Sequence, residues 1–480
     1  MHLPVIIRVT GVLLTLFSLT LLSPVLVAVI YDESTVPTFA VAFVITLVTG
    51  LLMWRLPRSD QELRAGDGFL VTVLFYLGLG LVGALPLYLF DPLESSFTNA
   101  AFESLSGLTT TGATVYSGLD DLPRSILFYR NLLNWLGGMG IIVLAVAILP
   151  MLGVGGMQLY RAESPGPVKD SKLTPRITET AKALWYLYVG LTGACALSYW
   201  VAGMGAFDAI CHSFSTVAIG GFSTHDLSIG FFDSVAIESV AIAFMLLSAI
   251  NFGLHFVVVS RRNPLLYLRD PEVRALAFML TVVGVIVVTV LSREGDSPAP
   301  LREALFQVVS ISTTTGFTTA NFSGWPSAVP MLLILAAFAG GCAGSTAGGI
   351  KMVRVLLLYL QGQRELRRLI HPTGIFPIKL AGQRVPNRVI ETVWSFFAAY
   401  VFLFLTLMTG LFLITEVDFQ TAFSAVGACM NNLGPGLGAV AENYAALPAG
   451  AKWLLIFAML LGRLEIFTLL VLLTPEFWRR

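Results

Sequence analysis

Long apolar runs dominate this chain, and short polar stretches return between them. Several runs reach the roughly 20 helical residues needed to cross a bilayer core of about 30 Å. Examples are Val5 to Ile30, Phe69 to Phe90, Ser234 to Ser260 and Trp394 to Ile414. A membrane barrel would instead show short segments of alternating polarity. The pattern therefore predicts an all-α polytopic membrane protein.

Composition supports this class, since the 480 residues are 56% hydrophobic, 12% charged and carry no net charge. Arg8 precedes the first apolar run, as in a secretory signal, but the run is too long for a typical signal core. A second span starts at about Val36. We therefore expect a retained pair of N-terminal transmembrane helices in residues 1–60, and regard a cleaved signal as the weaker alternative.

Basic residues predict the orientation of the chain in the membrane. Most of the 29 Lys and Arg residues fall in five segments, which are 55–64, 161–182, 261–274, 351–388 and 479–480. Such residues gather in cytoplasmic loops, so both termini should be cytoplasmic. The intervening loops are acidic. Acidic residues could simply solvate these loops, but a negative outer surface would also raise the local cation concentration.

One unit recurs four times between the basic loops. It has an apolar span, a short helix-length piece, a polar turn with glycine and a second span, and the copies cover 69–153, 180–260, 272–360 and 388–474. Aligning the turns places Gly112, Gly221, Gly316 and Gly434 in register. The short pieces, such as 96–108, cannot cross a bilayer and must re-enter it. We expect about ten transmembrane helices, including the N-terminal pair, and four re-entrant pore helices around one pore.

The polar turns are predicted to form a cation-selectivity filter. Irregular backbone at membrane depth must be buried or line a watery cavity, and inward carbonyls can replace a cation's hydration shell. A single turn would be read as a helix cap followed by a loop, but four copies in register favour the filter. Its candidate residues are Thr110, Thr111, Gly112, Ile219, Gly220, Gly221, Thr314, Thr315, Gly316, Asn432, Leu433 and Gly434.

Each residue type in these turns has an expected role. Glycine permits the backbone angles that aim successive carbonyls to one side. The hydroxyls of Thr111 and Thr315 can add oxygen ligands or hold the loop by local hydrogen bonds. One glycine per turn indicates a short filter of modest selectivity. Glu103, on the first short helix, is interpreted as bracing the filter.

A glycine-rich stretch, "FAGGCAGSTAGGIKMVRV", interrupts the second span of the third unit. Each interior glycine weakens a helix by about 1 kcal/mol relative to alanine, so the helix should break in mid-membrane. It lacks the GK[ST] of a phosphate-binding loop. Close helix packing or a simple kink are alternatives to a gate across the pore. The candidate gate residues are Gly340, Gly341, Gly344, Ser345, Thr346, Gly348, Gly349 and Arg463.

Arg463 lies inside the last apolar span, 453–473, where a charge must face protein or water. Glu465 is only two positions away on the expected helix and is a poor partner. The carbonyls of the glycine-rich loop or a water-filled pore are better hosts. The charge would also oppose cations below the filter.

Nothing in the sequence recommends an enzyme. The four cysteines and five histidines are scattered, without metal-ligand spacing. A secondary transporter built on broken helices is a second alternative, but its repeats would often be inverted. Here every unit starts inside and has its polar turn outside, which favours a pore.

At this point the chain resembles the Trk/Ktr/HKT superfamily of cation transporters, in which four membrane–pore–membrane units carry one filter glycine each. The N-terminal pair resembles the TrkH/TrkG branch, the potassium-uptake subunits of the Trk system. Glycine at all four positions is the pattern of potassium-permeable members, whereas serine in place of Gly112 is associated with sodium preference. The resemblance also supports an intramembrane gate loop at the glycine-rich stretch.

The resemblance implies partners as well. It implies a homodimer with one pore per subunit in the bacterial cytoplasmic (inner) membrane. It further implies a TrkA-type cytosolic nucleotide-binding regulatory subunit, which would dock on the basic loops. K⁺ would be the transported ion at the filter residues, with no organic cofactor and no nucleic acid. Symport and channel-like flux both stay open, as does a less selective Na⁺/K⁺ transporter.

Overall fold

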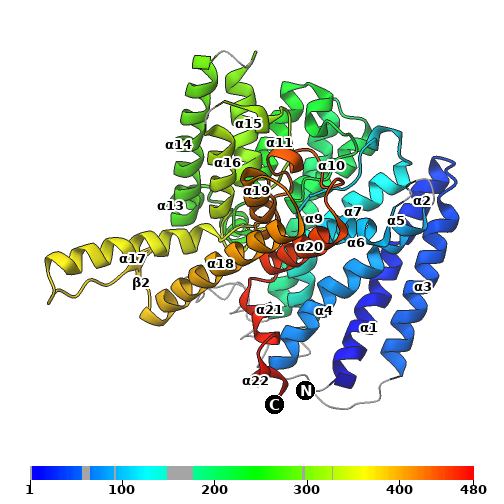
Figure 1. Cartoon of the computed structure of the whole chain (residues 1–480), viewed down its shortest axis with the longest axis horizontal. Coiled ribbons are helices and arrows are strands. Elements are labelled where there is room, and N and C mark those ends of the chain that lie inside the picture. The colour runs from blue at the N-terminus through cyan, green and yellow to red at the C-terminus, as the bar shows by residue number, and fades with distance from the viewer. Residues whose placement is uncertain are drawn as a thin grey trace.

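The computed structural model describes residues 3–56, 65–90, 93, 95–148, 177–294, 298–326 and 328–479. This part of the chain is helical apart from one hairpin, in which β1 (Lys379–Leu380) pairs antiparallel with β2 (Gln383–Arg384). The protein is an all-α polytopic membrane protein. Its helices form a broad body from which one arm, carrying α17 (Met352–Ile370) and the hairpin, projects (Figure 1).

The N-terminal helices form a hairpin beside the body, and their bounds are α1 (Leu3–Thr20), α2 (Leu22–Ile30) and α3 (Val36–Arg55). Two glycines let α1 and α3 approach closely, since a Cβ on Gly11 would lie 2.4 Å from the Trp54 backbone nitrogen. Glu33, in the turn between α2 and α3, accepts hydrogen bonds from the first backbone amides of α7 (Arg124–Ile148), including that of Ser125 at 3.0 Å. The hairpin is thereby fixed to the start of α7.

The rest of the chain follows four similar stretches of helices. The first has α4 (Ala65–Gly83), α5 (Leu85–Leu89), α6 (Phe97–Leu108) and α7 (Arg124–Ile148); the second has α9 (Ile177–Val201), α10 (Ala206–Ala218), α11 (Val235–Ser248) and α12 (Phe252–Arg261). After α13 (Leu265–Arg269), the third has α14 (Pro271–Glu294), α15 (Pro300–Ser312), α16 (Val329–Ala339) and α17 (Met352–Ile370). The fourth has α18 (Asn387–Ile414), α19 (Phe419–Met430), α20 (Ala449–Arg463), α21 (Phe467–Leu472) and α22 (Pro475–Trp478).

The four short helices α6, α10, α15 and α19 each contact a helix of the preceding stretch. α10 packs on α7, α15 on α11 and α19 on α16, while α6 packs on α20 and so joins the first stretch to the fourth. Their starts carry capping signals: the Ser96 hydroxyl accepts from the Asn99 amide, and Pro300 opens α15. These contacts arrange the short helices in a closed cycle at the centre of the body (Figure 1).

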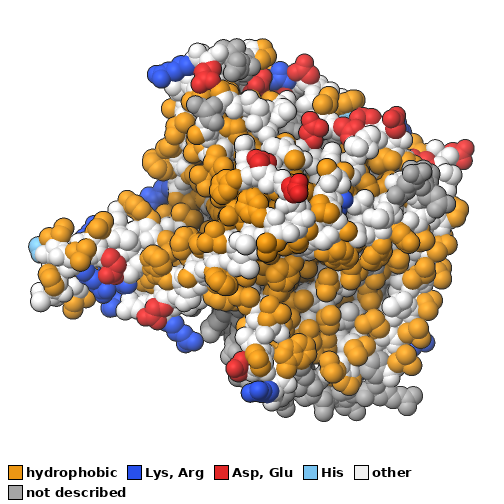
Figure 2. Space-filling model, in the orientation of Figure 1, with side chains coloured by type: hydrophobic (Ala, Val, Ile, Leu, Met, Phe, Trp, Pro, Cys, Tyr) orange, Lys and Arg blue, Asp and Glu red, His pale blue; other side chains and the backbone are white. Residues whose placement is uncertain are grey.

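Six helical spans of the described chain are long and apolar enough to cross a membrane. They are Leu3–Ile30, Val36–Arg55, Asp67–Leu89, Lys182–Val201, Pro271–Glu294 and Asn387–Ile414. The pair α11 and α12, bent by 96°, would make a seventh. Hydrophobic side chains cover much of the visible face, acidic ones gather at its upper edge, and several basic ones lie on the projecting arm (Figure 2).

The second spans of three stretches are broken, although the sequence predicts a break only at the glycine-rich stretch. The expectation of continuous helices across 234–260 and 453–473 is therefore wrong. In the second stretch, Asn251 caps a new helix by accepting from the Gly253 amide at 2.7 Å. In the fourth, Glu465 and Ile466 have φ values of 52° and 38°, which no α-helix can contain.

Candidate functional site

The four polar turns end the four short helices in the same backbone conformation. Gly112, Gly221, Gly316 and Gly434 have φ values of 77°, 71°, 84° and 97°. These values lie in a region that side chains disfavour and glycine tolerates. The turns predicted from the sequence thus share one geometry that depends on glycine.

The residue two positions before each glycine also has a positive φ, of 53° to 66°. These residues are Thr110, Ile219, Thr314 and Asn432. A left-handed conformation costs about 1 to 2 kcal/mol in a residue with a side chain, and such strain concentrates at functional sites. Four equivalent strained positions indicate that the conformation itself is required.

The structure brings the four turns into contact as a ring. A Cβ built on Gly112 would lie 2.2 Å from the carbonyl oxygen of Gly220, and one on Gly221 would lie 2.2 Å from that of Thr315. A Cβ on Gly316 would lie 2.1 Å from the carbonyl oxygen of Leu433, and one on Gly434 would lie 2.7 Å from that of Thr111. Each glycine therefore leaves room for the carbonyl that precedes the next glycine of the ring.

Side chains of the turns hold the ring from behind. The hydroxyls of Thr111 and Thr315 each lie 2.8 Å from a threonine hydroxyl two positions earlier. The Asn432 side-chain amide donates to the Thr111 hydroxyl at 3.0 Å, which links the fourth turn to the first. The Tyr444 hydroxyl donates to the Gly434 carbonyl oxygen at 2.8 Å. In this arrangement the threonine hydroxyls serve local hydrogen bonds.

The glycine-rich loop, residues 340–351, crosses directly behind this ring. The Gly348 amide donates to the Thr314 hydroxyl at 2.7 Å, and the Gly349 amide donates to the Asn431 carbonyl oxygen at 3.1 Å. A Cβ on Gly348 would lie 1.9 Å from the same Asn431 oxygen. The loop therefore lies in contact with the third and fourth turns and obstructs the space behind them.

Other contacts anchor the loop away from the ring. The Cys342 amide donates to the Ala249 carbonyl at 2.9 Å, and the Phe252 amide donates to the Gly344 carbonyl at 3.0 Å. The break between α11 and α12 thus has its free backbone groups satisfied by the loop. Glu272, at the start of α14, accepts from the Ala343 amide at 2.8 Å.

Arg463 ends α20 beside the loop and is 8% exposed. Its guanidinium donates to the Thr346 carbonyl at 3.2 Å and to the Gly137 carbonyl at 2.7 Å. The arginine therefore connects the loop to α7. Two backbone carbonyls host the charge, and the structure gives it no carboxylate partner within the described residues.

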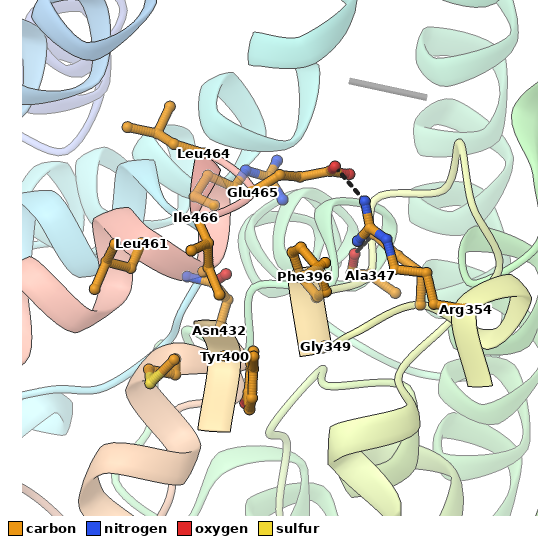
Figure 3. A pocket seen from close by; sticks show the side chains of 15 residues that line it. Ala347, Gly349, Arg354, Phe396, Tyr400, Asn432, Leu461, Leu464, Glu465 and Ile466 are labelled. Atoms are coloured by element: carbon orange, nitrogen blue, oxygen red, sulfur yellow. Dashed lines mark hydrogen bonds and ion pairs between the residues drawn. The ribbon is translucent and has the colours of Figure 1, made fainter. Parts of the chain in front are cut away.

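A small cavity of about 40 Å³ lies between the loop, α18 and the break after α20 (Figure 3). Arg354 and Glu465 meet across it in an ion pair of 2.5 Å, and the Arg354 guanidinium stacks 4.0 Å from the centre of the Phe396 ring. Lys351 turns its ammonium group back to the Ala347 carbonyl. A cavity of this volume has room for only a few water molecules, so side chains fill most of the space behind the ring.

A histidine flanked by two carboxylates lies after the second turn. The His225 ring is 2.5 Å from an Asp120 oxygen and 3.6 Å from an Asp208 oxygen, and it stacks on Phe231. Burial alone would lower the pKa of His225, but hydrogen bonds and charge from Asp208 and Asp120 outweigh it and raise that pKa. The His225 ring therefore joins the segments that follow the first two turns.

Several residues of this region were missed by sequence reasoning. Arg130 donates to Glu103 on α6, and Asn251 caps α12 next to the loop. Glu272 accepts from the Ala343 amide of the loop, and Arg354 donates to the Ile350 carbonyl of the loop. A usable signal existed in two of them. Arg130 is a lone charge within an apolar run, and Asn251 precedes a Phe-Gly pair in the manner of a helix cap.

The family described as "TrkH: Cation transport protein" matches residues 35–480. The Trk system potassium uptake protein TrkH of Vibrio parahaemolyticus is 55% identical over 99% of each chain, and TrkH of Escherichia coli K12 is 53% identical over the full length of both. The Escherichia coli TrkG protein is 43% identical over 100% of this chain and 99% of its own.

A solved structure agrees in fold. The crystal structure of the potassium transporter TrkH from Vibrio parahaemolyticus superposes with a TM-score of 0.91 at 52% identity, covering 100% of both chains. The family match, the full-length relatives and this superposition point the same way. This chain belongs to the TrkH family of cation transport proteins.

Proposed function

We propose that this chain takes up potassium across the bacterial cytoplasmic membrane through the ring of four turns. Its full-length relatives carry the name of potassium uptake proteins. The observation that carries the proposal is the ring itself, in which every glycine leaves room for the carbonyl oxygen before the next glycine. Four carbonyl-bearing turns around one opening can replace the hydration shell of a cation.

The surrounding helices add to this cation site. Each of the four short helices ends at its turn, so the negative end of its dipole faces the ring. The site gains cation affinity without a fixed carboxylate, which would hold an ion too tightly for rapid passage. A short filter of this kind also fits the alternative of a less selective Na⁺/K⁺ transporter.

The glycine-rich loop and Arg463 act as the gate in this proposal. The loop lies against the third and fourth turns, and Arg463 fastens it to α7. A positive charge behind the filter also opposes cations. Opening then requires the loop to leave the Thr314 hydroxyl and the arginine to release the Thr346 carbonyl.

In this proposal, the cytosolic surface binds the regulatory subunit and a second copy of the chain. α17 projects from the body and carries three arginines near its end, which suit a TrkA-type nucleotide-binding subunit. The same arm exposes Leu366, Leu369 and Ile370, which a second copy of the chain would cover in a homodimer. Both termini lie in the cytoplasm in this arrangement. Chemical cross-linking of the arm in native membranes tests the dimer.

Ion flux into proteoliposomes tests the filter. We expect uptake of potassium and rubidium in preference to sodium once the gate is open, and loss of that preference in Gly316→Ser. Gly324→Ser is the matched control, because a Cβ at this glycine of the same repeat meets no atom within 4 Å. Equal selectivity in the wild type and Gly316→Ser would overturn the filter. Arg463→Ala should raise flux without the cytosolic partner, and flux that stayed partner-dependent would overturn the gate.

A further inference from the structure

The four short helices differ at one equivalent position, nine residues before the filter glycine. The residues there are Glu103, His212, Gln307 and Ala425, and all four are fully buried. The equivalent positions thus run from a charged side chain through an imidazole and an amide to a methyl group. Since the ring geometry is nearly the same in all four turns, this difference calls for a separate explanation.

In the first two repeats, this residue ties the short helix to the chain that leaves the filter. Glu103 accepts from the Thr114 hydroxyl at 2.9 Å and from the Val115 amide at 2.9 Å. The His212 Nε2 atom lies 2.9 Å from the Ser223 hydroxyl. Thr114 and Ser223 both stand two residues after their filter glycine. In both repeats, a polar side chain therefore joins the short helix to the second residue after the filter glycine, although the two side chains differ in chemistry.

The other two repeats use contacts between neutral groups. The Gln307 side-chain amide donates to the Ala320 carbonyl at 3.1 Å. In the fourth repeat Ala425 makes no such bond, and the neighbouring Ser424 hydroxyl accepts from the Leu437 amide at 2.8 Å. A neutral hydrogen bond contributes modestly because it replaces one to water.

Arg130 joins the first two repeats to each other. It pairs with Glu103 at 2.7 Å, and its guanidinium donates to the Ser223 carbonyl at 3.1 Å. The guanidinium also stacks 4.5 Å from the centre of the Phe222 ring, directly after the second filter glycine. Arg130 and Glu103 are 1% and 0% exposed. The network therefore runs without interruption from Glu103 through Arg130 and Ser223 to His212.

The buried ion pair makes the first and second filter segments stiffer than the third and fourth. A buried ion pair that also forms hydrogen bonds resists displacement of either partner, because separation leaves an uncompensated charge. The first two exit segments are therefore joined to one another through a buried ion pair, whereas those of the third and fourth repeats are held by hydrogen bonds between neutral groups. Carbonyls held at a fixed separation cannot close around a smaller ion.

We propose that Glu103, Arg130 and His212 are positioning residues that set potassium-over-sodium discrimination by fixing the first and second filter segments at one separation. This inference rests on the proposed filter function. Gln307 and Ser424 contribute less to discrimination. None of these side chains touches the ion; they act through Thr114 and Ser223.

The test compares ion uptake by Glu103→Gln, Arg130→Lys and the double variant Glu103→Gln with Arg130→Gln. Gln307→Leu and Ser424→Ala are the matched controls at the neutral positions. Arg130→Lys keeps the charge beside Glu103 but loses the forked contact with Ser223 and Phe222, so it preserves folding best. Initial rates for K⁺ and Na⁺, the half-saturating K⁺ concentration and the melting temperature are measured for every variant.

We expect Arg130→Lys and Glu103→Gln to lower the K⁺/Na⁺ rate ratio about tenfold, equivalent to about 1.4 kcal/mol. The K⁺ rate and the melting temperature of Arg130→Lys should stay near wild type. If Arg130 had a merely structural role, the K⁺ rate and the melting temperature would fall together with the K⁺/Na⁺ rate ratio. The double variant should recover part of the ratio, since it leaves no buried charge unpaired. The two control variants should change the ratio less than about twofold.

The inference is overturned if Arg130→Lys folds and keeps the wild-type ratio, or if the two controls lower it as much. Failure of the proposed function looks different. In that case wild-type protein with an open gate shows no K⁺ preference, and Gly316→Ser changes nothing. A selective wild type that is sensitive to Gly316→Ser but indifferent to Arg130→Lys refutes only the positioning network.

Discussion

Alanine at each filter glycine should affect transport unequally, and the ring geometry gives the order. A Cβ would lie 2.1 to 2.2 Å from a neighbouring carbonyl oxygen at Gly112, Gly221 and Gly316, but 2.7 Å from one at Gly434. Cβ atoms in folded proteins essentially never come within 3.0 Å of another heavy atom. The fourth position therefore requires the smallest displacement of the ring.

The distances translate into a displacement of about 0.8 to 0.9 Å at the first three positions and about 0.3 Å at Gly434. The positive φ adds about 1 kcal/mol at every position, so it does not change the order. A displacement near 0.8 Å moves a carbonyl out of the ring, and we expect each of these three variants to lose at least about tenfold in the K⁺/Na⁺ ratio. Gly434→Ala should lose about threefold.

Initial rates of K⁺, Rb⁺ and Na⁺ uptake into proteoliposomes measure these ratios, with the gate opened by Arg463→Ala in every sample. Gly324→Ala is the control, since its Cβ meets no atom within 4 Å. The reasoning fails if Gly434→Ala is as damaging as Gly316→Ala, because the order comes from the carbonyl distances alone. It also fails if Gly324→Ala lowers the ratio as much as any filter variant.

Three further predictions concern the gate and the outer surface. Glu465→Gln removes the carboxylate that pairs with buried Arg354, which should weaken the closed arrangement of the loop by about 3 kcal/mol. K⁺ flux measured without the cytosolic subunit should therefore rise. Unchanged flux would refute this prediction. Thr314→Val leaves the Gly348 amide without its acceptor at a cost of about 1 to 3 kcal/mol. Partner-independent leak of K⁺ should therefore rise, and an unchanged leak would contradict the role of this contact in holding the loop closed. The pKa of His225 is raised in the folded state, so its ion pairs with Asp120 and Asp208 stabilise the fold fully below pH 6.5, the ordinary pKa of histidine. This stabilisation is lost as the pH rises through the raised pKa. His225→Gln should therefore lower the melting temperature in acid but not in alkaline solution, and a pH-independent effect would contradict this.

The sequence predicted the fold class because its signals are local. Apolar runs of spanning length, basic loops and short helices before a glycine can all be recognised within about twenty residues. The recurrence of these signals also placed Gly112, Gly221, Gly316 and Gly434 in register. Positive φ at each of them follows from the requirement that a turn end the short helix.

The sequence predicted four turns around one pore, but not which carbonyl each glycine meets, because these contacts join residues about a hundred or more positions apart. The contact of Gly434 with the Thr111 carbonyl joins the two ends of the repeat series. The breaks at Asn251 and after Arg463 were hidden for a similar reason. Backbone groups freed at a break are tolerated only where a distant segment satisfies them, and here the glycine-rich loop does so for the first of them.

Sequence alone therefore determined the class of protein, the positions of the four turns and the existence of the glycine-rich interruption. Only the tertiary structure decided what the buried charges contact. Arg130 and Glu103 pair behind the ring, Arg354 and Glu465 pair behind the loop, and Arg463 rests on two backbone carbonyls. The physical reason is that a charge in an apolar segment must find a partner, but local sequence does not say which one, because the partner comes from whichever helix the fold packs beside it.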